Sequence, residues 1–586
     1  MKKIKNLIKQ YYLYVLTIIA IVLPWFFNHG YLFFTDMSWG AQIKLNFYSG
    51  WFLTNVFLKS LSFLLPMDLI QKIFIAITLL TVLLGAKKIV DNFLSNKYSI
   101  FIVSLFAIFN PFIYDRMMYG QIGIVLAFAF LCFLVGYLLE YLNKEKNSQI
   151  LVAGIFTAFS IQFSMHFIFF VGAFWLLFII AFILKKRMIS KKLLKGVALV
   201  IIFVFVLNFN WILGMSLGIT PQAKSISSGI QKQDFIAFQT SGKTGLEALK
   251  NVVMMSGFWG KDQYRYIDLT KVKEGWGRSF VLLLPLILLG ILSGLKIIKP
   301  KNSEELRIEN RELSKNKADH SKGGIHNSKF LILYSRMLAV GLIILYVIAI
   351  ILAVGIRLPV AREITYWMFE HIPFYKGMRE TQKWVAVIVV IYLIFLSIGV
   401  KRLFQFKIIE KNKIIVSIFL SGVIIMQAPL MLWGLGGQVK PTEYPQDWYE
   451  VNEFIKLESY KVHKVENVCN DSILFLPWHM YMGFSWIGNV VSNPAYKFFS
   501  CPVIQGSNME WGGIYNNSGD TKSEAIQNWI FTKGQMDLLS NNEIDIKYVI
   551  LAKEVDWKDY LWIDKINELV LIRETETLIV YKVKSS

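Results

Sequence analysis

The chain has 586 residues, of which 55% are hydrophobic, and its mean hydropathy is +0.48. Apolar runs of about 17–25 residues recur, long enough to cross a hydrocarbon layer of about 30 Å as helices, which excludes an ordinary soluble protein. The formal net charge of +22 comes from Lys and Arg that gather in short clusters between these runs. This pattern is typical of topology signals and anionic-headgroup contacts, so we expect a polytopic membrane protein and no nucleic-acid partner.

The N-terminal part of the chain predicts a series of membrane spans. A cluster of lysines precedes the first apolar run and places the N-terminus in the cytoplasm by the positive-inside rule. An aromatic-rich stretch, NFYSGWFLTNVFLKSLSFLL, is expected to lie along the membrane interface. We predict spans at residues 12–28, 67–86, 98–114, 121–142, 149–164, 167–184 and 196–216.

Further spans are predicted at residues 279–296, 330–354, 382–399 and 413–433, which makes about eleven in total. Each turn assigned to the cytoplasm carries Lys or Arg, and this count places the C-terminus outside. The resulting transmembrane domain, 1–437, has external loops at 29–66, 217–278 and 355–381. The charged stretch 299–329 predicts a solvated cytoplasmic linker.

Residues 438–586 have a different composition, with no spanning segment. SILFLPW and KYVILAKE alternate as strands do, and LVLIRETETLIVYKV predicts two strands joined by a tight turn. YPQDWYEVNEFIKL and SEAIQNWIFTKGQMDLLS are expected to be helical. We therefore predict a small external α/β domain at 438–586. Cys469 and Cys501 would pair there as a disulfide, and two buried thiols are the alternative.

Charged and polar side chains from separate spans gather at the predicted external face. Charges at a membrane boundary are costly unless paired or hydrated, so we expect a shared polar cavity. An acid that faces several cations suits group transfer from a lipid phosphate, because the acid takes a proton from the acceptor hydroxyl while the cations stabilise the departing phosphate. The set comprises Asp36, Asp115, Arg116, Tyr119, Gln121, His166, His371, Lys376, Arg379, Glu380 and Lys383.

Each of these residues also has a structural interpretation. Asp36 could form an ion pair that fixes its loop, and Asp115 and Arg116 could cap helix ends and reach toward the interface. His166 could be an interfacial histidine with satisfied hydrogen bonds. The basic residues of 379–383 precede a span that starts outside, where basic residues are unusual, and this placement favours an anionic ligand.

The chain resembles the GT-C class of membrane glycosyltransferases and, more narrowly, YfhO-like and arabinofuranosyltransferase-like membrane proteins of bacteria and archaea. The stretches that carry the resemblance are FFTDMSW, NPFIYDRMMYGQIG, IPFYKGMRETQKW, YPQDWYEVNEF, LFLPWHMYMGFSW, SNPAYKFF and YVILAKEVDW. The resemblance implies a multi-pass protein of the plasma membrane that contacts membrane lipids. It also implies inverting transfer of a sugar from a polyprenyl-phosphate donor to a glycan or glycolipid acceptor of the cell envelope.

In that class an acid of the first external loop is the catalytic base, and Asp36 is the matching position. Arg116, Arg379 and Lys383 would then lie near the donor phosphate. The supporting residues would be Asp115, Tyr119, Gln121, His166 and Glu380.

The loop has a single Asp rather than a paired acidic motif, which leaves the need for a divalent cation, Mg or Mn, open. Asp36 and Asp115 would be its ligands if the turn at 115–121 folds over the first loop. Trp478, His479 and Trp486 offer flat faces for an acceptor sugar, and packing against the membrane domain is the alternative use of these side chains.

Two other functions remain open at this stage. A transporter or flippase for lipid-linked glycans would place charged or Gly/Pro-broken positions at mid-membrane, whereas the predicted span centres are almost purely apolar. A scaffold of an envelope complex could have the same fold without the chemistry, because fold does not fix function.

Overall fold

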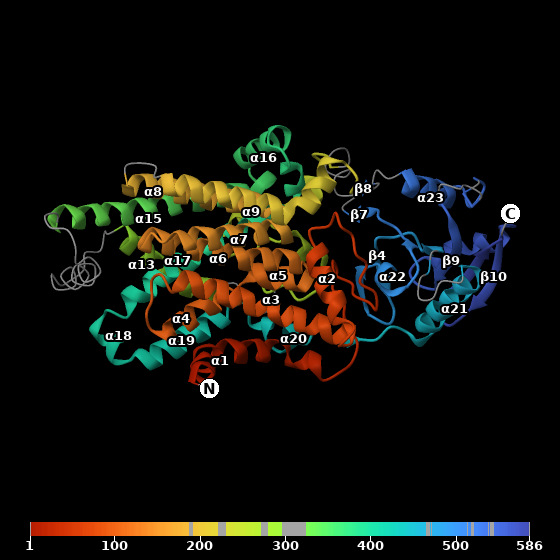
Figure 1. Ribbon diagram of the computed structural model, residues 1–586, viewed down its shortest axis with the longest axis horizontal. Coiled ribbons are helices and arrows are strands. Elements are labelled where there is room, and N and C mark those ends of the chain that lie inside the picture. Colours follow the sequence, from red (N-terminus) through yellow and green to blue (C-terminus); the bar gives the residue numbers. More distant parts are fainter. Residues whose placement is uncertain are drawn as a thin grey trace.

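Long apolar helices lie side by side along the long axis of the computed structural model, and the strands of the C-terminal region lie at one end of them (Figure 1). The structure describes residues 2–186, 191–220, 230–270, 279–295, 324–463, 469, 471–511, 514–516, 521–536, 538–539 and 544–584.

The first helices of the chain are α1 (Lys2–Val22), α2 (Phe52–Leu61), α3 (Met67–Val90), α4 (Lys97–Leu105), α5 (Pro111–Tyr119), α6 (Ile122–Lys144), α7 (Asn147–Phe163), α8 (Phe167–Lys186) and α9 (Lys191–Ser216). Among them, α3, α6, α7, α8 and α9 follow predicted apolar runs. The later helices are α11 (Asp234–Ala237), α12 (Gly245–Val253), α13 (Ser279–Gly294), α15 (Gly324–Val354), α16 (Pro359–His371), α17 (Val385–Leu403), α18 (Lys407–Lys411), α19 (Lys413–Ile425) and α20 (Leu432–Gly436).

The described part of the chain has 6 helices long and apolar enough to cross a membrane, or 7 if one bent pair counts as a span. These helices make the protein a membrane protein. The count of about eleven spans stays a prediction, since α13 is apolar but shorter, as is the stretch Tyr11–Phe26. Of the predicted linker 299–329, residues 324–329 begin α15, and 299–323 lie outside the described residues.

The predicted span 98–114 is wrong as a single helix, because the chain breaks between α4 and α5. Pro111 disfavours the helical conformation at the residue before it, and Asn110 is extended, with φ −148° and ψ 154°. The side chain of Asn110 accepts a hydrogen bond from the backbone N–H of Ile113 at 3.0 Å and so caps α5. As a result, Asp115 and Arg116 lie in a short, fully buried helix rather than at an exposed helix end.

The predicted span 413–433 is also not one straight helix. The axis bends by 79° between α19 and the segment Pro429–Gly436. Pro429 lies at the bend, where its missing N–H and its ring are incompatible with an uninterrupted helix.

A five-stranded sheet forms the centre of the C-terminal region, with strand order β10-β11-β9-β3-β6. β3 pairs in parallel with β6 and β9, and β11 pairs antiparallel with β9 and β10. The predicted pair of strands in LVLIRETETLIVYKV is confirmed as β10 and β11. The strands are β3 (Ser472–Leu476), β6 (Val503–Ile504), β9 (Ile546–Ala552), β10 (Leu569–Glu574) and β11 (Leu578–Val583).

Short helices and two-stranded ladders surround this sheet. The remaining elements are β1 (Tyr31–Leu32), β2 (Pro441–Thr442), α21 (Gln446–His463), β4 (Tyr481–Phe484), β5 (Asn489–Ser492), α22 (Ala495–Phe498), β7 (Met509–Trp511), β8 (Ile514–Asn516) and α23 (Thr521–Phe531). The predicted helix SEAIQNWIFTKGQMDLLS ends at Phe531. Of the two alternatives for Cys469 and Cys501, the structure has the disulfide.

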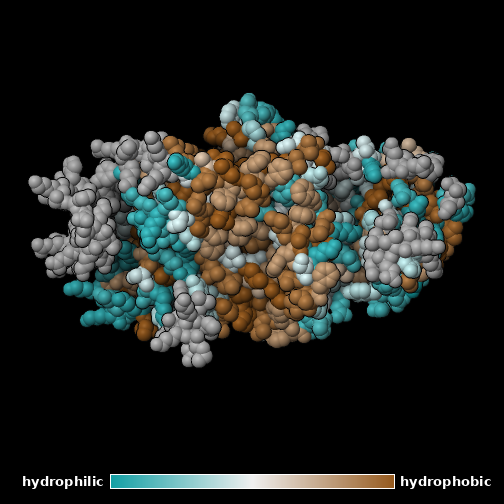
Figure 2. Space-filling view, in the orientation of Figure 1, coloured by the Kyte–Doolittle hydropathy of each residue, from teal (hydrophilic) through white to brown (hydrophobic). Residues whose placement is uncertain are grey.

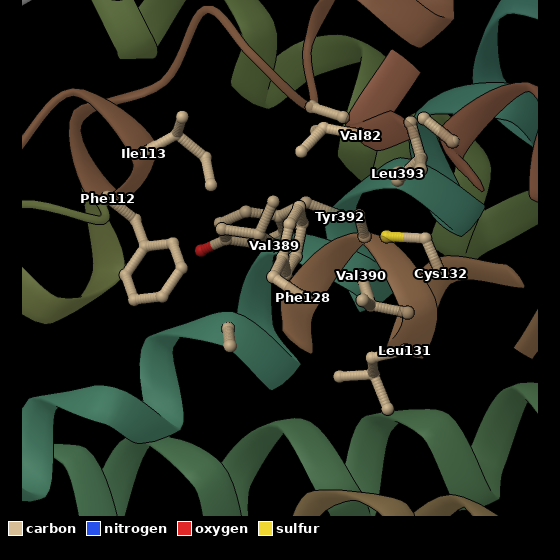
Figure 3. Close-up of a cluster of buried hydrophobic side chains, with 14 of the residues drawn as sticks. Val82, Phe112, Ile113, Phe128, Leu131, Cys132, Val389, Val390, Tyr392 and Leu393 are labelled. Atoms are coloured by element: carbon tan, nitrogen blue, oxygen red, sulfur yellow. The ribbon is translucent and has the colours of Figure 1, made fainter. Parts of the chain in front are cut away.

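The main hydrophobic core lies inside the helical bundle, and α17 is its central helix. Side chains of α3, α5 and α6 meet those of α17 there, as Figure 3 shows for Phe112, Phe128, Val389 and Val390. α17 is buried along nearly its whole length because its sequence is apolar all round. Over the outside of the bundle, apolar side chains gather in the middle of the molecule and hydrophilic ones toward its ends (Figure 2).

Candidate functional site

A cavity of about 780 Å³ lies where the first loop meets the helical bundle and the C-terminal region. Asp36, Gln121 and His166 line one part of it, and Tyr496 and Lys497 of α22 line another. The volume is within the usual range for a site that takes a small organic ligand. Tryptophans from the first loop and from α9 also contribute to its wall: Trp39, Trp51 and Trp211.

The first loop, red to orange in Figure 1, is held between the bundle and the C-terminal region. β1 pairs with β2, so Tyr31 lies opposite Thr442. Further along, the N–H of Ser492 donates to the carbonyl of Thr35 at 2.7 Å. These contacts fix the backbone on both sides of Asp36, and they come from residues more than four hundred positions later in the chain.

The turn between α5 and α6 packs on the same loop from the bundle side. The N–H of Asp36 donates to the carbonyl of Tyr119 at 2.8 Å. Gly120 ends α5 with φ +81°, and a Cβ at this position would lie 2.6 Å from the Cβ of Phe34. A glycine is therefore required both by the left-handed backbone and by the close approach of the loop.

The carboxylate of Asp36 accepts two hydrogen bonds that fix its orientation at the cavity wall. Gln121 donates to Oδ2 at 2.8 Å, and the hydroxyl of Tyr481 donates to Oδ1 at 3.0 Å. Desolvation raises the pKa of Asp36 to about 6, although these two hydrogen bonds act in the opposite direction. A carboxylate with this pKa is largely ionised at neutral pH and is well matched to a general base.

Behind Asp36 lies a buried charge network, defined here as Arg116, Glu380, Lys383 and His166. Arg116 donates to Glu380 at 2.7 Å and also to the side-chain oxygen of Gln121. Lys383 lies 3.2 Å from the other carboxylate oxygen of Glu380 and 3.3 Å from Nε2 of His166. The contacts therefore run without a break from Tyr481 through Asp36 and Gln121 to His166, and they join elements that are distant in sequence.

The charges of this network and its burial determine the protonation states of Glu380 and His166. Burial alone would raise the pKa of Glu380, but Lys383 and Arg116 hold it well below its usual range. Burial and the Lys383 ammonium lower the pKa of His166 to about 3, so the imidazole is neutral at physiological pH. The carboxylate of Glu380 thus forms ion pairs with two buried cations, Arg116 and Lys383. Neither cation is among the described residues that line the cavity.

Other predicted site residues lie nearby with different partners. Asp115 accepts a hydrogen bond from Tyr266 at 3.0 Å, and burial together with Asp268 raises its pKa to about 7. The hydroxyl of Tyr119 donates to Gln263 at 2.6 Å. Both side chains therefore contact the segment that follows α12 rather than the cavity.

The guanidinium of Arg379 lies 4.6 Å from the ring centroid of Phe238 and has no carboxylate partner among the described residues. His371 is exposed at the end of α16, and Lys376 lies 5.6 Å from the ring centroid of Phe369. Of these three, Arg379 acts on the charge network, where it lowers the pKa of His166.

The described residues contain no group of three or more His, Cys, Asp or Glu side chains that could hold a metal ion. The two predicted ligands, Asp36 and Asp115, are bonded to different partners, Gln121 and Tyr481 for one and Tyr266 for the other. The arrangement therefore gives no support to a cation held by these two carboxylates together.

The aromatic residues predicted for acceptor binding do not line the cavity. Trp478 is buried in the cluster on one face of the sheet, and the ring of Trp486 packs against Phe33 with centroids 5.3 Å apart. His479 lies 3.1 Å from the carboxylate of Asp556. Trp486 thus joins the C-terminal region to the first loop, which is the packing role that the sequence left as an alternative.

Sequence reasoning placed Tyr481 on the aromatic surface proposed for an acceptor sugar rather than beside Asp36, and it assigned no role to Tyr496, Lys497 or Lys44. Tyr481 begins strand β4, whose alternating burial turns Tyr481 and Gly483 to the same side. That alternation is visible in the sequence, but nothing local indicates that this side meets Asp36.

No family model matches the chain, and no curated protein sequence matches it significantly. Its fold is nevertheless that of a GT-C-like membrane protein. It is similar to the cryo-EM structure of the arabinofuranosyltransferase AftD from Mycobacteria, with a TM-score of 0.60 and 10% sequence identity over 99% of this chain and 40% of that one. A mutant of AftD gives a TM-score of 0.57 at 10% identity, over 99% of this chain and 42% of that one.

The chain spans about two fifths of the length of AftD. The resemblance predicted from the sequence is therefore confirmed for the fold.

Proposed function

We propose that the protein is an inverting glycosyltransferase of the GT-C type. In this proposal it moves a sugar from a polyprenyl-phosphate donor to a hydroxyl of a cell-envelope acceptor, at the external face of the membrane. The observation that carries the proposal is Asp36, a doubly hydrogen-bonded carboxylate with a pKa of about 6 on the wall of a ligand-sized cavity.

In the proposed reaction the acceptor hydroxyl donates its hydrogen bond to Asp36. The hydroxyl oxygen attacks the anomeric carbon of the donor from the face opposite the phosphate, and the bond from that carbon to the phosphate oxygen breaks. Asp36 takes the hydroxyl proton, and the bonding electron pair leaves with the phosphate. The configuration at the anomeric carbon is inverted because a single displacement occurs.

The surrounding residues have supporting roles in this scheme. Gln121 and Tyr481 hold the carboxylate in one orientation, which limits the reorganisation needed at the moment of transfer. Arg116 and Lys383 contribute positive potential from behind the wall, although Glu380 balances part of it. Arg379 has no carboxylate partner among the described residues and is our candidate to approach the departing phosphate, although it is not among the described residues that line the cavity.

The transport alternative is less well supported by the packing. A path for a polar headgroup would need polar or broken positions along the centre of the bundle. The side chains around α17 that Figure 3 displays, among them Phe128, Val389, Val390 and Leu393, are apolar and closely packed.

The test is sugar transfer by the purified full chain in lipid nanodiscs, with synthetic polyprenyl-phosphate sugars as donors and a panel of envelope glycans as acceptors. Asp36→Asn should lower kcat by about 10²- to 10⁴-fold while donor binding is retained. The matched control is Asp91→Asn, which removes an Asp that pairs with Lys87 on α3, far from the cavity. Unchanged turnover in Asp36→Asn would remove the proposed base. Donor binding by the unaltered protein without turnover on any acceptor would favour a carrier.

A further inference from the structure

Two lysines from different parts of the chain lie close to one aromatic ring, that of the cavity-lining Tyr496. The ammonium of Lys44, in the first loop, lies 4.6 Å from the ring centroid of Tyr496, and that of Lys497, on α22, lies 5.6 Å from it. Both distances are within the range of a cation–π contact. Lys44 also donates to the carbonyl of Cys501 at 2.9 Å, so its position is fixed by the disulfide-linked segment.

This lysine pair, Lys44 and Lys497, has no ion-pair partner among the described residues. Burial lowers the pKa of Lys44 to about 8, with a further contribution from Lys497, and burial also lowers the pKa of Lys497. Two positive charges that are partly withdrawn from water and close enough to repel each other cost folding free energy. A bound anion would relieve both the repulsion and the loss of hydration.

One member of the lysine pair, Lys497, lines the cavity, and Lys44 lies beside the same cavity-lining ring, that of Tyr496. Lys497 is the only Lys or Arg among the described residues that line the cavity. The wall around it is polar and fixed, because Gln505 accepts a hydrogen bond from the N–H of Tyr496 at 2.9 Å and donates to the carbonyl of Asn493 at 3.0 Å. The cations of the buried charge network differ from Lys497, since neither lines the cavity and both are paired with Glu380.

The position of the pair also indicates which ligand would carry the anion. A polyprenyl donor must keep its chain among apolar helices, and the helices that could span a membrane all precede residue 438 in the described chain. Tyr496 and Lys497 instead belong to α22 in the C-terminal region, which contributes the sheet and its short helices. An anion held there is carried by the water-facing partner of the reaction.

We propose that Lys44 and Lys497, which both lie beside the ring of Tyr496, form a site that binds a phosphate or carboxylate group of the acceptor, so that the acceptor is an anionic glycan. The assignment to an acceptor rests on the proposed function, whereas anion binding at this site does not depend on it.

The test measures how fast each lysine is acylated in the full chain, in nanodiscs of phosphatidylcholine at pH 8, by mass spectrometry of the labelled peptides. The probes are inorganic phosphate, glucose 1-phosphate and glucuronate, with glucose as the uncharged control and ionic strength held constant. At ten times its Kd a ligand occupies roughly nine tenths of the sites, so acylation of Lys44 and Lys497 should slow about tenfold. Lys59, which is exposed on α2, should be unaffected.

Two substitutions at Lys497 test whether the protection of Lys44 from acylation depends on the lysine pair. Lys497→Gln should abolish the protection of Lys44, whereas Lys497→Arg should retain it. Continued slow acylation of Lys72, which is buried beside Asp68, would show that both variants are folded. Protection of Lys44 that persists in Lys497→Gln would overturn the paired site.

Two further labelling experiments identify which molecule carries the bound anion. Nanodiscs that contain phosphatidylglycerol test a lipid headgroup, and added polyprenyl phosphate tests the donor. Protection by either of these, with none added by the sugar anions, would overturn the acceptor assignment, and no protection by any anion would overturn the site. Because labelling needs no turnover, its result is independent of the outcome for Asp36→Asn.

Discussion

Positive charge occurs at two places around the cavity, and the two are built in opposite ways. In the buried charge network, Arg116 and Lys383 share the carboxylate of Glu380 and are withdrawn from the cavity. In the lysine pair, Lys44 and Lys497 lie against one ring with no acid beside them in the described chain. A cation that is balanced within the protein holds elements together, whereas a cation left unbalanced at a cavity is available to a ligand.

The largest effect expected from this comparison comes from removing the shared carboxylate. Glu380→Gln leaves two buried cations without a counter-charge, and breaking a buried ion pair in this way costs about 3–5 kcal/mol. We expect a decrease of this size in the free energy of unfolding, measured by denaturant titration in mild detergent. The control is Glu410→Gln, since Glu410 forms an exposed pair with Lys413, where the loss should stay below about 1 kcal/mol. Equal effects of the two substitutions would contradict the structural role of the network.

The second prediction, with a smaller expected effect, concerns the pH dependence that Asp36 would give as the proposed base. In the proposed mechanism the ionised form of Asp36 is the active one, so kcat/KM should rise as the pH increases through about 6 and level off above it. Tyr481→Phe removes a hydrogen bond that favours the carboxylate, and we expect the acid limb of the profile to move up by about one pH unit, equivalent to about 1.4 kcal/mol. Tyr264→Phe, at an exposed tyrosine, is the control. A lower rate with an unmoved acid limb would mean that Tyr481 does not act on this carboxylate.

The smallest effect is expected at the lysine pair. Lys497→Gln removes no ion pair among the described residues and relieves a repulsion, so the free energy of unfolding should change by no more than about 0.5 kcal/mol. The same denaturant titration measures it. A loss comparable to that of Glu380→Gln would show that Lys497 is a structural cation, and the contrast between the two places would disappear.

The sequence predicts the helices better than it predicts their interruptions. The apolar run at 121–142 corresponds to α6 nearly residue for residue, because a long apolar stretch has few other stable states in a membrane. The breaks at Pro111 and Pro429 were missed because hydropathy does not register a proline within an apolar run.

For the candidate site, too, the sequence predicts one part and not another. Positive-inside topology was enough to predict that Asp36, His166 and Glu380 lie at one end of the bundle, and the structure brings them into one connected set of contacts. Topology says nothing about which side chain touches which across the cavity. The hydrogen bond from Tyr481 to Asp36 joins positions 445 residues apart, and no local pattern encodes such a contact.

That separation has a consequence for how the protein is made. The chain emerges from the ribosome at about 5–20 residues per second, so Asp36 is synthesised roughly 20–90 s before Tyr481. Over the same interval β1 lacks β2, its partner strand. The first loop therefore reaches its final geometry only after the last part of the chain has been delivered and folded. A chain terminated before residue 441 would lack both β2 and Tyr481, so its first loop and Asp36 would be left without these contacts.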